Sequence, residues 1–114
     1  MPNSRSLQTL AADDFRDFIG TAFQLAAGPP ESGLPAAIGL ELAEVTGFAA
    51  NAAPGAARAP FSLLFHGPLQ PVMPQGIYRL EHARFGEFEP FIVPVGPAVS
   101  GQAPVAMRYE VVFG

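Results

Sequence analysis

The stretch FSLLFH at residues 61–66 is the strongest indicator of fold in this chain. Phe61, Leu63 and Phe65 recur at every second position, and side chains two residues apart on a strand point to one face of the sheet. This alternation predicts a core strand. Because Leu64 makes the opposite face apolar as well, we expect the strand to be covered on both sides, with a helix as one candidate cover.

Glycine and proline divide the rest of the chain into further short strands. Six strands are expected in all, at about 21–26, 39–48, 61–66, 77–83, 87–95 and 107–113. The alternation of the second strand slips after Ala43, and a bulge there would restore it. Pro90 and Pro94 predict that the fifth is an edge strand or a bulged one, because proline cannot donate to a ladder. The stretches 49–60 and 98–104 are expected to be loops.

One short helix is expected at 10–19, before the first strand. Thr9 offers an N-cap and Gly20 a stop, and two aspartates near the start suit the positive end of a helix: Asp13 and Asp14. Three apolar residues fall at helical spacing and predict one buried stripe: Phe15, Phe18 and Ile19. The whole pattern predicts a mainly β single domain over 1–114. A small six-stranded barrel and a two-sheet sandwich, with the helix plugging one open end, both fit it.

Composition excludes several classes of partner and chemistry. The 114 residues are 49% hydrophobic and only 14% charged, which favours a folded domain whose low surface charge suits self-association. The net charge is −4 and the six basic residues, all Arg, are scattered, so neither nucleic acid nor an anionic membrane is an expected partner. Without Cys, the chain has no disulfide, thiol nucleophile or thiolate metal site.

The first residues and the hydropathy of the chain bear on its location. No apolar region of the signal-peptide type follows Arg5, and no run approaches the roughly 18 apolar residues of a membrane span. We therefore expect synthesis in the cytoplasm. The final site of action is left open.

Several segments, taken in order, carry a family resemblance. They are FIGTAF at 18–23, FSLLF at 61–65 with Gly67-Pro68, PQGIYRLEH at 74–82, Gly86, FIVPVGP at 91–97 and RYEVVF at 108–113. With these segments the chain resembles a family of small bacterial domains of unknown function. The resemblance covers about half of the chain and implies a shared fold, without an assigned activity. It also suggests a place in a larger, phage-tail-like assembly.

His66 and His82 are the first candidates for a polar or metal site. Each ends an expected strand, so the two could meet at one end of the fold, with Glu110 or Asp17 as a third ligand. No H-x-H or H-x-x-x-H pair places two ligands on one element. The sequence therefore predicts no metal and no cofactor, and each histidine is more simply a strand-end residue hydrogen-bonded to a loop.

Catalytic serines and paired carboxylates find little support. Ser62 lies on a strand without the glycine-flanked elbow of a nucleophile, and Ser100 has no evident partner. Glu87 and Glu89 share a strand face close to a turn, where charge keeps an edge strand from pairing wrongly. No catalytic residue is assigned, and a small hydrolase is the third hypothesis.

Aromatic residues near loops are the candidates for contact with a partner. Phe48 and Phe85 are either exposed anchors or lids folded back over the core, and both interpretations are kept. The full set of candidate interaction residues is Phe48, Phe85, Glu87, Glu89 and Phe91. We expect a non-catalytic structural or interaction domain that contacts other protein chains, copies of itself included, through 87–95 and 48–60. A barrel that binds a small ligand at its open end is the alternative.

Overall fold

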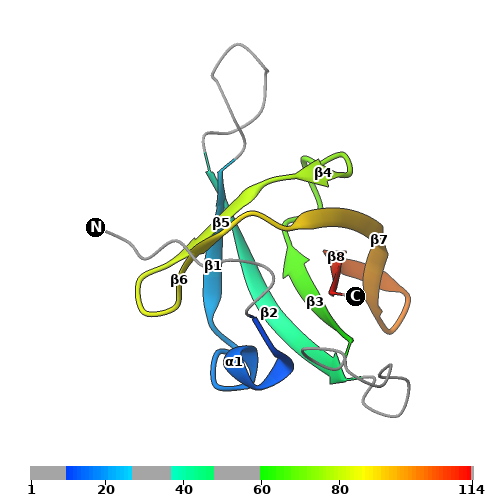
Figure 1. Cartoon of the computed structure of the whole chain (residues 1–114). Coiled ribbons are helices and arrows are strands. Elements are labelled where there is room, and N and C mark those ends of the chain that lie inside the picture. Colours follow the sequence, from blue (N-terminus) through cyan, green and yellow to red (C-terminus); the bar gives the residue numbers. More distant parts are fainter. Residues whose placement is uncertain (1–9, 27–36, 48–59, 114) are drawn as a thin grey trace.

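Eight strands and one short helix form the described part of the chain, residues 10–26, 37–47 and 60–113, in the computed structural model (Figure 1). They are α1 (Ala12–Arg16), β1 (Ala22–Ala26), β2 (Ala37–Gly47), β3 (Phe61–Gly67), β4 (Gly76–Ile77), β5 (Arg79–His82), β6 (Gly86–Phe88), β7 (Phe91–Ser100) and β8 (Ala103–Phe113). All strands join one antiparallel sheet in the order β4–β7–β8–β3–β2–β1–β5–β6, which does not close. The predicted mainly β fold is confirmed.

The strand number differs from the predicted six because one expected hairpin is broken in its middle. Tyr78 separates β4 from β5, and Glu89 with Pro90 separates β6 from β7. The register nevertheless stays the same on both sides of the break, since Leu80 lies opposite Phe88 and Ile77 opposite Phe91. Between these pairs, the Tyr78 N–H donates to the Pro90 carbonyl over 3.2 Å.

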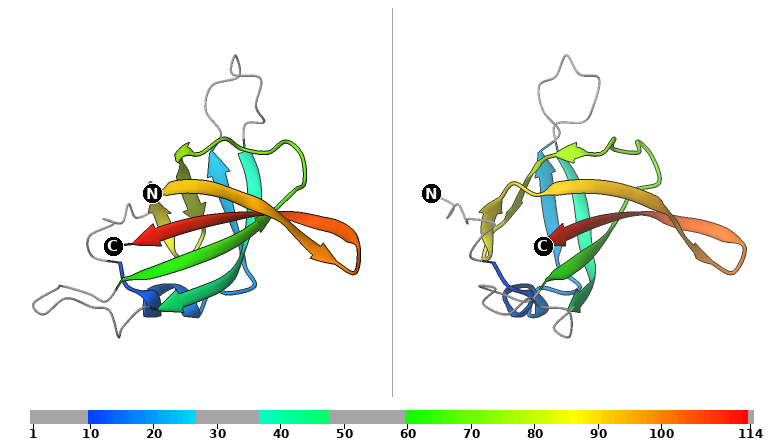
Figure 2. Two further views of the ribbon diagram at one scale, coloured as in Figure 1. Left: turned by 90° about the vertical axis from the view of Figure 1, so that its right-hand side faces the viewer. Right: turned by 45° about the vertical axis from the view of Figure 1, so that its right-hand side comes forward.

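The two halves of this broken hairpin lie at opposite ends of the strand order. Strand β5 pairs with β1 at one end, while β7 pairs with β8 at the other. The hairpin therefore connects the two ends of the sheet, which curves so that both ends approach each other (Figure 2).

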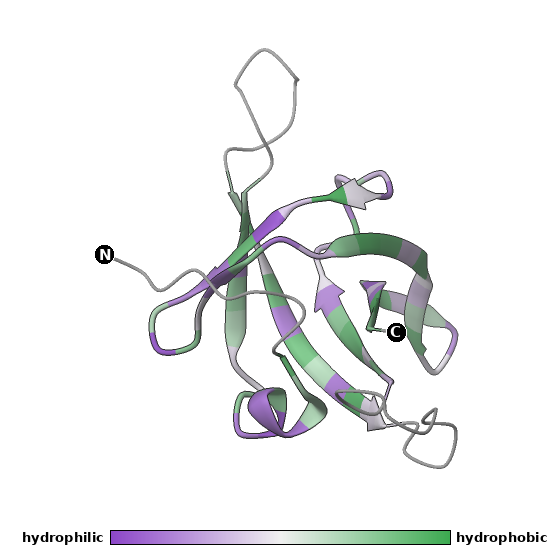
Figure 3. Cartoon of the chain, viewed as in Figure 1, coloured by the Kyte–Doolittle hydropathy of each residue, from purple (hydrophilic) through white to green (hydrophobic). Residues whose placement is uncertain are grey.

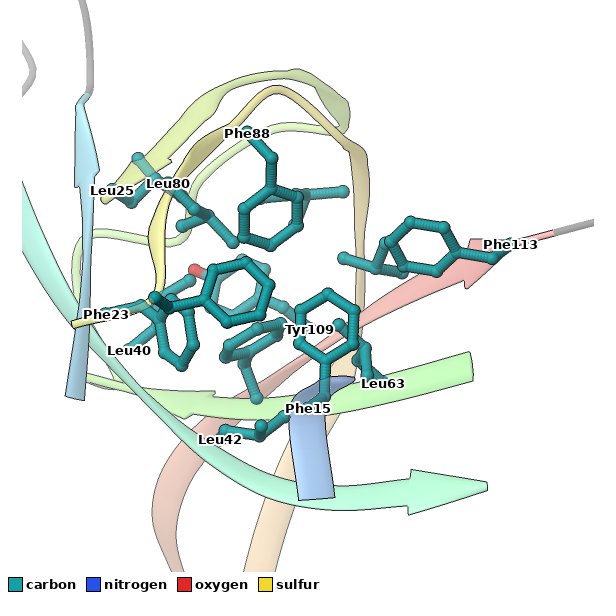
Figure 4. Packing of buried hydrophobic residues seen from close by; sticks show 14 of the residues in the cluster. Phe15, Phe23, Leu25, Leu40, Leu42, Leu63, Leu80, Phe88, Tyr109 and Phe113 are labelled. Carbon is teal, nitrogen blue, oxygen red and sulfur yellow. The ribbon is translucent and has the colours of Figure 1, made fainter. Parts of the chain in front are cut away.

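The core lies on the inner face of this curved sheet. Its residues alternate along the strands as the sequence predicts, and one aromatic residue from α1, Phe15, joins them (Figure 4). The fully buried strand residues include Phe23, Leu25, Leu40, Leu42, Phe61, Leu63, Phe65, Leu80, Phe88, Tyr109 and Val111. The connection between β3 and β4 also reaches the core, because the Met73 N–H donates to the Tyr109 hydroxyl over 2.9 Å.

A bulge in β2 corrects the slip in its alternation. The pairing shifts between Leu42, opposite Phe65, and Glu44, opposite Leu64. The shift turns Glu44 to solvent and places Val45 opposite Leu63 against the core. The predicted bulge after Ala43 is confirmed.

The helix is shorter than the predicted 10–19. It ends at Arg16, and the chain then turns through Gly20, whose φ of 89° favours glycine. The Ala11 N–H donates to the Asp14 carboxylate over 2.8 Å, so Asp14 caps the first turn; the predicted cap, Thr9, lies outside the described residues. Ile19 is 46% exposed, which makes its predicted place in the buried stripe wrong.

Strands β7 and β8 extend further than the sequence indicated. The expected loop at 98–104 is wrong, because Ser100 pairs with Ala103 across a tight turn in which Gly101 has a φ of 65°. The far end of this hairpin extends beyond the other strands (Figure 2). The other expected loop, at 49–60, lies outside the described residues up to position 59. Across the parts that the structure describes, no helix has the length and apolar character needed to cross a membrane.

Candidate interaction surface

The two histidines do not form a common site. His66 on β3 alternates with the buried Phe65 and so lies on the outer face, next to Glu41 and Arg108 in the ladders. His82 on β5 packs its ring against the core residue Phe23, with ring centroids 4.8 Å apart. Strands β2 and β1 separate the two. Within the described residues, no three His, Asp or Glu side chains are grouped as a metal ion would need.

His82 holds a turn in place through both ring nitrogens. Its Nδ1 accepts from the N–H groups of Arg84, at 3.1 Å, and Phe85, at 3.3 Å. Its Nε2 lies 3.1 Å from Thr21 Oγ1, which itself donates to the Phe18 carbonyl over 2.6 Å. This pattern fits a neutral ring that carries its proton on Nε2. Burial, and secondarily the charge of Arg84, lower the pKa of His82 from its usual 6.5.

Phe85 is a core residue and not a surface anchor. It is only 3% exposed and stacks on Phe15, with ring centroids 4.7 Å apart. Its ring also meets Phe18, Phe23 and Phe88. Of the two interpretations kept for this residue, the lid is confirmed and the exposed anchor is wrong. Phe48, the other aromatic candidate, lies outside the described residues.

The remaining candidates lie around the break in the hairpin. Glu87 is half-buried on β6 and faces Glu81, which is itself ion-paired with Arg79. Glu89 is exposed in the break itself. Phe91, 50% exposed at the start of β7, lies opposite Ile77 on β4. Of the three, only Phe91 presents a large apolar surface to solvent.

The two serines considered as nucleophiles have ladder neighbours that are not bases. Ser62 is buried between Thr46 on β2 and Val112 on β8. Ser100 lies at the hairpin tip opposite Ala103. Neither ladder therefore supplies the histidine or carboxylate that would activate a hydroxyl.

Exposed apolar side chains gather at one end of the sheet. In the described residues, all large exposed hydrophobic side chains except Ile19 and Val72 lie on β4, β7 and β8; they are Ile77, Phe91, Val95, Val99, Val105 and Val112. We call these six residues the apolar end. Phe91 and Val112 alternate with the buried Ile92 and Val111 and lie on the outer face, whereas Val99 lies on the core-facing side of the β7–β8 hairpin.

Charge is scarce at the same end. Pro90 to Met107 contains no Asp, Glu, Lys or Arg, and β4 contains none either. In Figure 3 most of β7 is green, whereas purple, hydrophilic segments are seen on α1, around the turn between β5 and β6 and on β2. The sequence already contained this uncharged run. Its glycines and prolines are also typical of loops, although residues 98–100 and 103–104 belong to paired strands.

Arg108 is one of two charged residues on β8, and its guanidinium is directed at the backbone. Its Nε donates to the Gly96 carbonyl and its Nη2 to the Val95 carbonyl, each over 3.3 Å. These carbonyls belong to a bulge in β7, where the pairing shifts between Pro94 and Gly96. Arg108 therefore fixes the base of the projecting hairpin, residues 95–107, which we call the arm.

Comparison with known proteins supports the resemblance found in the sequence. The family model described as Domain of unknown function (DUF6916) matches residues 10–113. Separate comparisons of the chain with curated proteins and with solved structures find no match.

Proposed function

We propose that this chain, which belongs to the family of domains of unknown function matched over residues 10–113, is a non-catalytic protein-interaction domain. Membership of that family assigns no activity to it. Its contact surface is the apolar end of the sheet. The observation that carries the proposal is the coincidence of exposed hydrophobic side chains with missing charge on β4, on β7 and on β8 up to Met107.

The energetics of burial support this surface. Covering apolar area stabilises a complex by roughly 25 cal/mol for each Å² removed from water. Centres of protein interfaces are depleted in charge and enriched in aromatic residues, and Phe91 is the aromatic residue of the apolar end. The one basic group there, Arg108, already hydrogen-bonds its own backbone, so a partner need not strip water from a free cation.

The other two functions have less support. The inner face is filled by one continuous cluster of buried side chains, so a small ligand would have to bind outside the core. A hydrolase needs a histidine whose free lone pair can act as the general base. The Nδ1 lone pair of His82 already accepts hydrogen bonds from the backbone. A surface role needs neither a cavity nor a free base.

Site-specific photo-cross-linking in the cells that produce the protein tests this proposal. A benzophenone amino acid replaces Phe91 in one variant and Ile19 in another. Ile19 is a matched control because it is 46% exposed, against 50% for Phe91, and lies away from the apolar end. We expect a protein adduct from position 91 and none from position 19. Equal adducts from both positions, or none from position 91, would contradict the proposal.

A further inference from the structure

We propose that the turn between β5 and β6, residues 83–85, is a pH-sensitive switch: a proton added to His82 releases this turn and, with it, Phe85 from the core. The switch lies at the end of the strand order opposite to β4 and β7, and it does not depend on the proposed function. Three features carry it: the hydrogen bonds that His82 already makes, the groups that surround its ring, and the contacts that the turn maintains.

The neutral His82 ring can bind a further proton only at the nitrogen that holds the turn. Nδ1 accepts hydrogen bonds from the N–H groups of Arg84, at 3.1 Å, and Phe85, at 3.3 Å. Nε2 lies 3.1 Å from a threonine hydroxyl that donates elsewhere, so Nε2 already carries a proton. A proton from solvent therefore binds to Nδ1. Because both nitrogens of an imidazolium are donors, Nδ1 can then no longer accept from the two backbone N–H groups, and both hydrogen bonds are lost.

Other contacts hold the His82 ring in place, so the turn has to move. The Thr21 hydroxyl still accepts from Nε2 after protonation, because that N–H is unchanged. Two aromatic rings also contact the imidazole: Phe18 with centroids 5.0 Å apart, and Phe23 with centroids 4.8 Å apart. Rotating the imidazole to point Nδ1 elsewhere would break the contact with Thr21 as well. The repulsion between donors therefore acts on the turn.

The charge of Arg84 acts in the same direction. Its guanidinium carbon lies 5.3 Å from the centre of the Phe18 ring, which itself contacts His82. A charged imidazolium would be repelled by this guanidinium, and the repulsion falls when the turn moves away. Burial, and secondarily this charge, lower the pKa of His82 from its usual 6.5, so the switch responds to acid and not to neutral pH.

The acidic groups on the elements around His82 do not offset this repulsion. Strand β1 has no charged residue. Glu81 precedes His82 on β5, so it points to the opposite face, where it is ion-paired with Arg79. Glu87 lies opposite Glu81 on β6 and shares that face. The carboxylates on α1 and at its end bind groups of the helix or are exposed; they are Asp13, Asp14 and Asp17.

Release of the turn opens the core at one place only. Phe85 is 3% exposed and its ring stacks on Phe15, so an outward movement of the turn breaks this stack and exposes both rings. Phe15 still contacts Phe61 on β3 and Phe113 on β8. The pairing of β3 with β8 does not involve the turn. We therefore expect a local opening in acid, with the sheet retained.

An NMR titration of the isotope-labelled chain, from neutral to mildly acidic pH, tests the switch. We expect the His82 ring and the amide signals of Arg84 and Phe85 to titrate together, with one midpoint below 6.5. Cross-relaxation between the rings of Phe85 and Phe15 should disappear over the same range. The amide signals of Leu63, on β3, and of other residues in the β3–β8 ladder should keep their positions.

Two exposed arginines provide matched variants. Arg84→Gln keeps the backbone N–H and removes the charge, so the midpoint of His82 should rise toward 6.5. Arg79→Gln removes a charge from the outer face of β5 and should leave the midpoint where it is. His82→Asn retains an acceptor and does not titrate, so the acid-dependent change of the turn should be absent. The unmodified chain and the arginine pair decide the question even if His82→Asn does not fold.

Three results would overturn the inference. If the His82 ring titrates while the amides of Arg84 and Phe85 stay unchanged, the proton is accommodated without moving the turn. If the signals of β3 and β8 are lost together with those of the turn, acid unfolds the whole domain and no local switch exists. If the turn of a folded His82→Asn variant still changes in acid, another group is responsible.

Discussion

The ring of Phe85 stacks on the ring of Phe15, with centroids 4.7 Å apart and planes inclined by 28°. This contact joins the turn between β5 and β6 to helix α1. Because a five-residue helix has little stability of its own, its position depends on such contacts.

Truncating Phe85 is therefore expected to destabilise the fold strongly. Phe85→Ala should lower the free energy of unfolding by about 3–5 kcal/mol, the usual range for a buried aromatic residue. Urea unfolding followed by circular dichroism measures this. Phe91→Ala is the matched control, because half of that ring is already in solvent, and it should cost much less. Equal losses in the two variants would show that Phe85 does not belong to the core.

Stability is expected to fall in mild acid because of His82. Its folded pKa lies below the unfolded value of about 6.5, so the unfolded chain binds the proton more readily. The contribution of His82 is thus complete above that pH and is lost as the pH falls through the folded pKa. His82→Asn keeps an acceptor for the turn and does not titrate, so it should reduce the loss. Thermal unfolding across the pH range measures the effect.

The comparison variant for this prediction is His66→Asn. It retains His82 and its hydrogen bonds to Arg84 and Phe85, so the acid-dependent loss should remain. If His66→Asn removed the loss and His82→Asn did not, the assignment to His82 would be wrong.

Gly67 and Gly39 both lie on strands, and they differ in what an added Cβ would meet. A Cβ at Gly67 would lie 2.5 Å from Leu40 Cδ2 and 3.3 Å from the Tyr109 ring, both in the core. Gly67→Ala is therefore expected to cost about 1–3 kcal/mol through overpacking. A Cβ at Gly39 would meet only the Gln24 amide at 3.8 Å, so Gly39→Ala should be close to neutral. Thermal melts of both variants check the order, and a reversed order would refute the packing described here.

Arg108 should control the rigidity of the arm more than the stability of the domain. Arg108→Lys keeps the charge but loses the two-pronged hydrogen bonding to the Val95 and Gly96 carbonyls. We expect faster amide hydrogen exchange at residues 96–106 and a loss of only about 1 kcal/mol in stability. Arg79→Lys, which alters an exposed ion pair with Glu81, is the control and should leave exchange in the arm unchanged.

Period-two alternation made the core of this fold predictable. It identified the buried faces of β1, β2, β3 and β8, and even the bulge after Ala43, because these depend on the side chains of single strands. The family resemblance added the expectation of a shared fold, which the match over residues 10–113 supports.

The arm was not predictable by the same reasoning. Proline and glycine usually end strands. Here Pro97 and Pro104 lie within the two strands of the arm, and Gly101 lies in the turn between them. The histidine pair failed for a different reason. Whether His66 and His82 meet depends on which strands lie between them, and a single sequence does not contain the strand order. The place of Phe85 likewise depended on a helix distant in sequence.

The broken hairpin makes the unfolding of this domain a collective event. An ordinary open sheet loses its outermost strands first, because they have neighbours on one side only. Here β5 and β7 belong to one hairpin of continuous register, so loosening β5 from β1 also disturbs β7 against β8. Amide protection at Gln24, on β1, and at Glu110, on β8, should therefore decay together as denaturant is added. The hairpin therefore couples the stability of the β1–β5 pairing to that of the β7–β8 pairing.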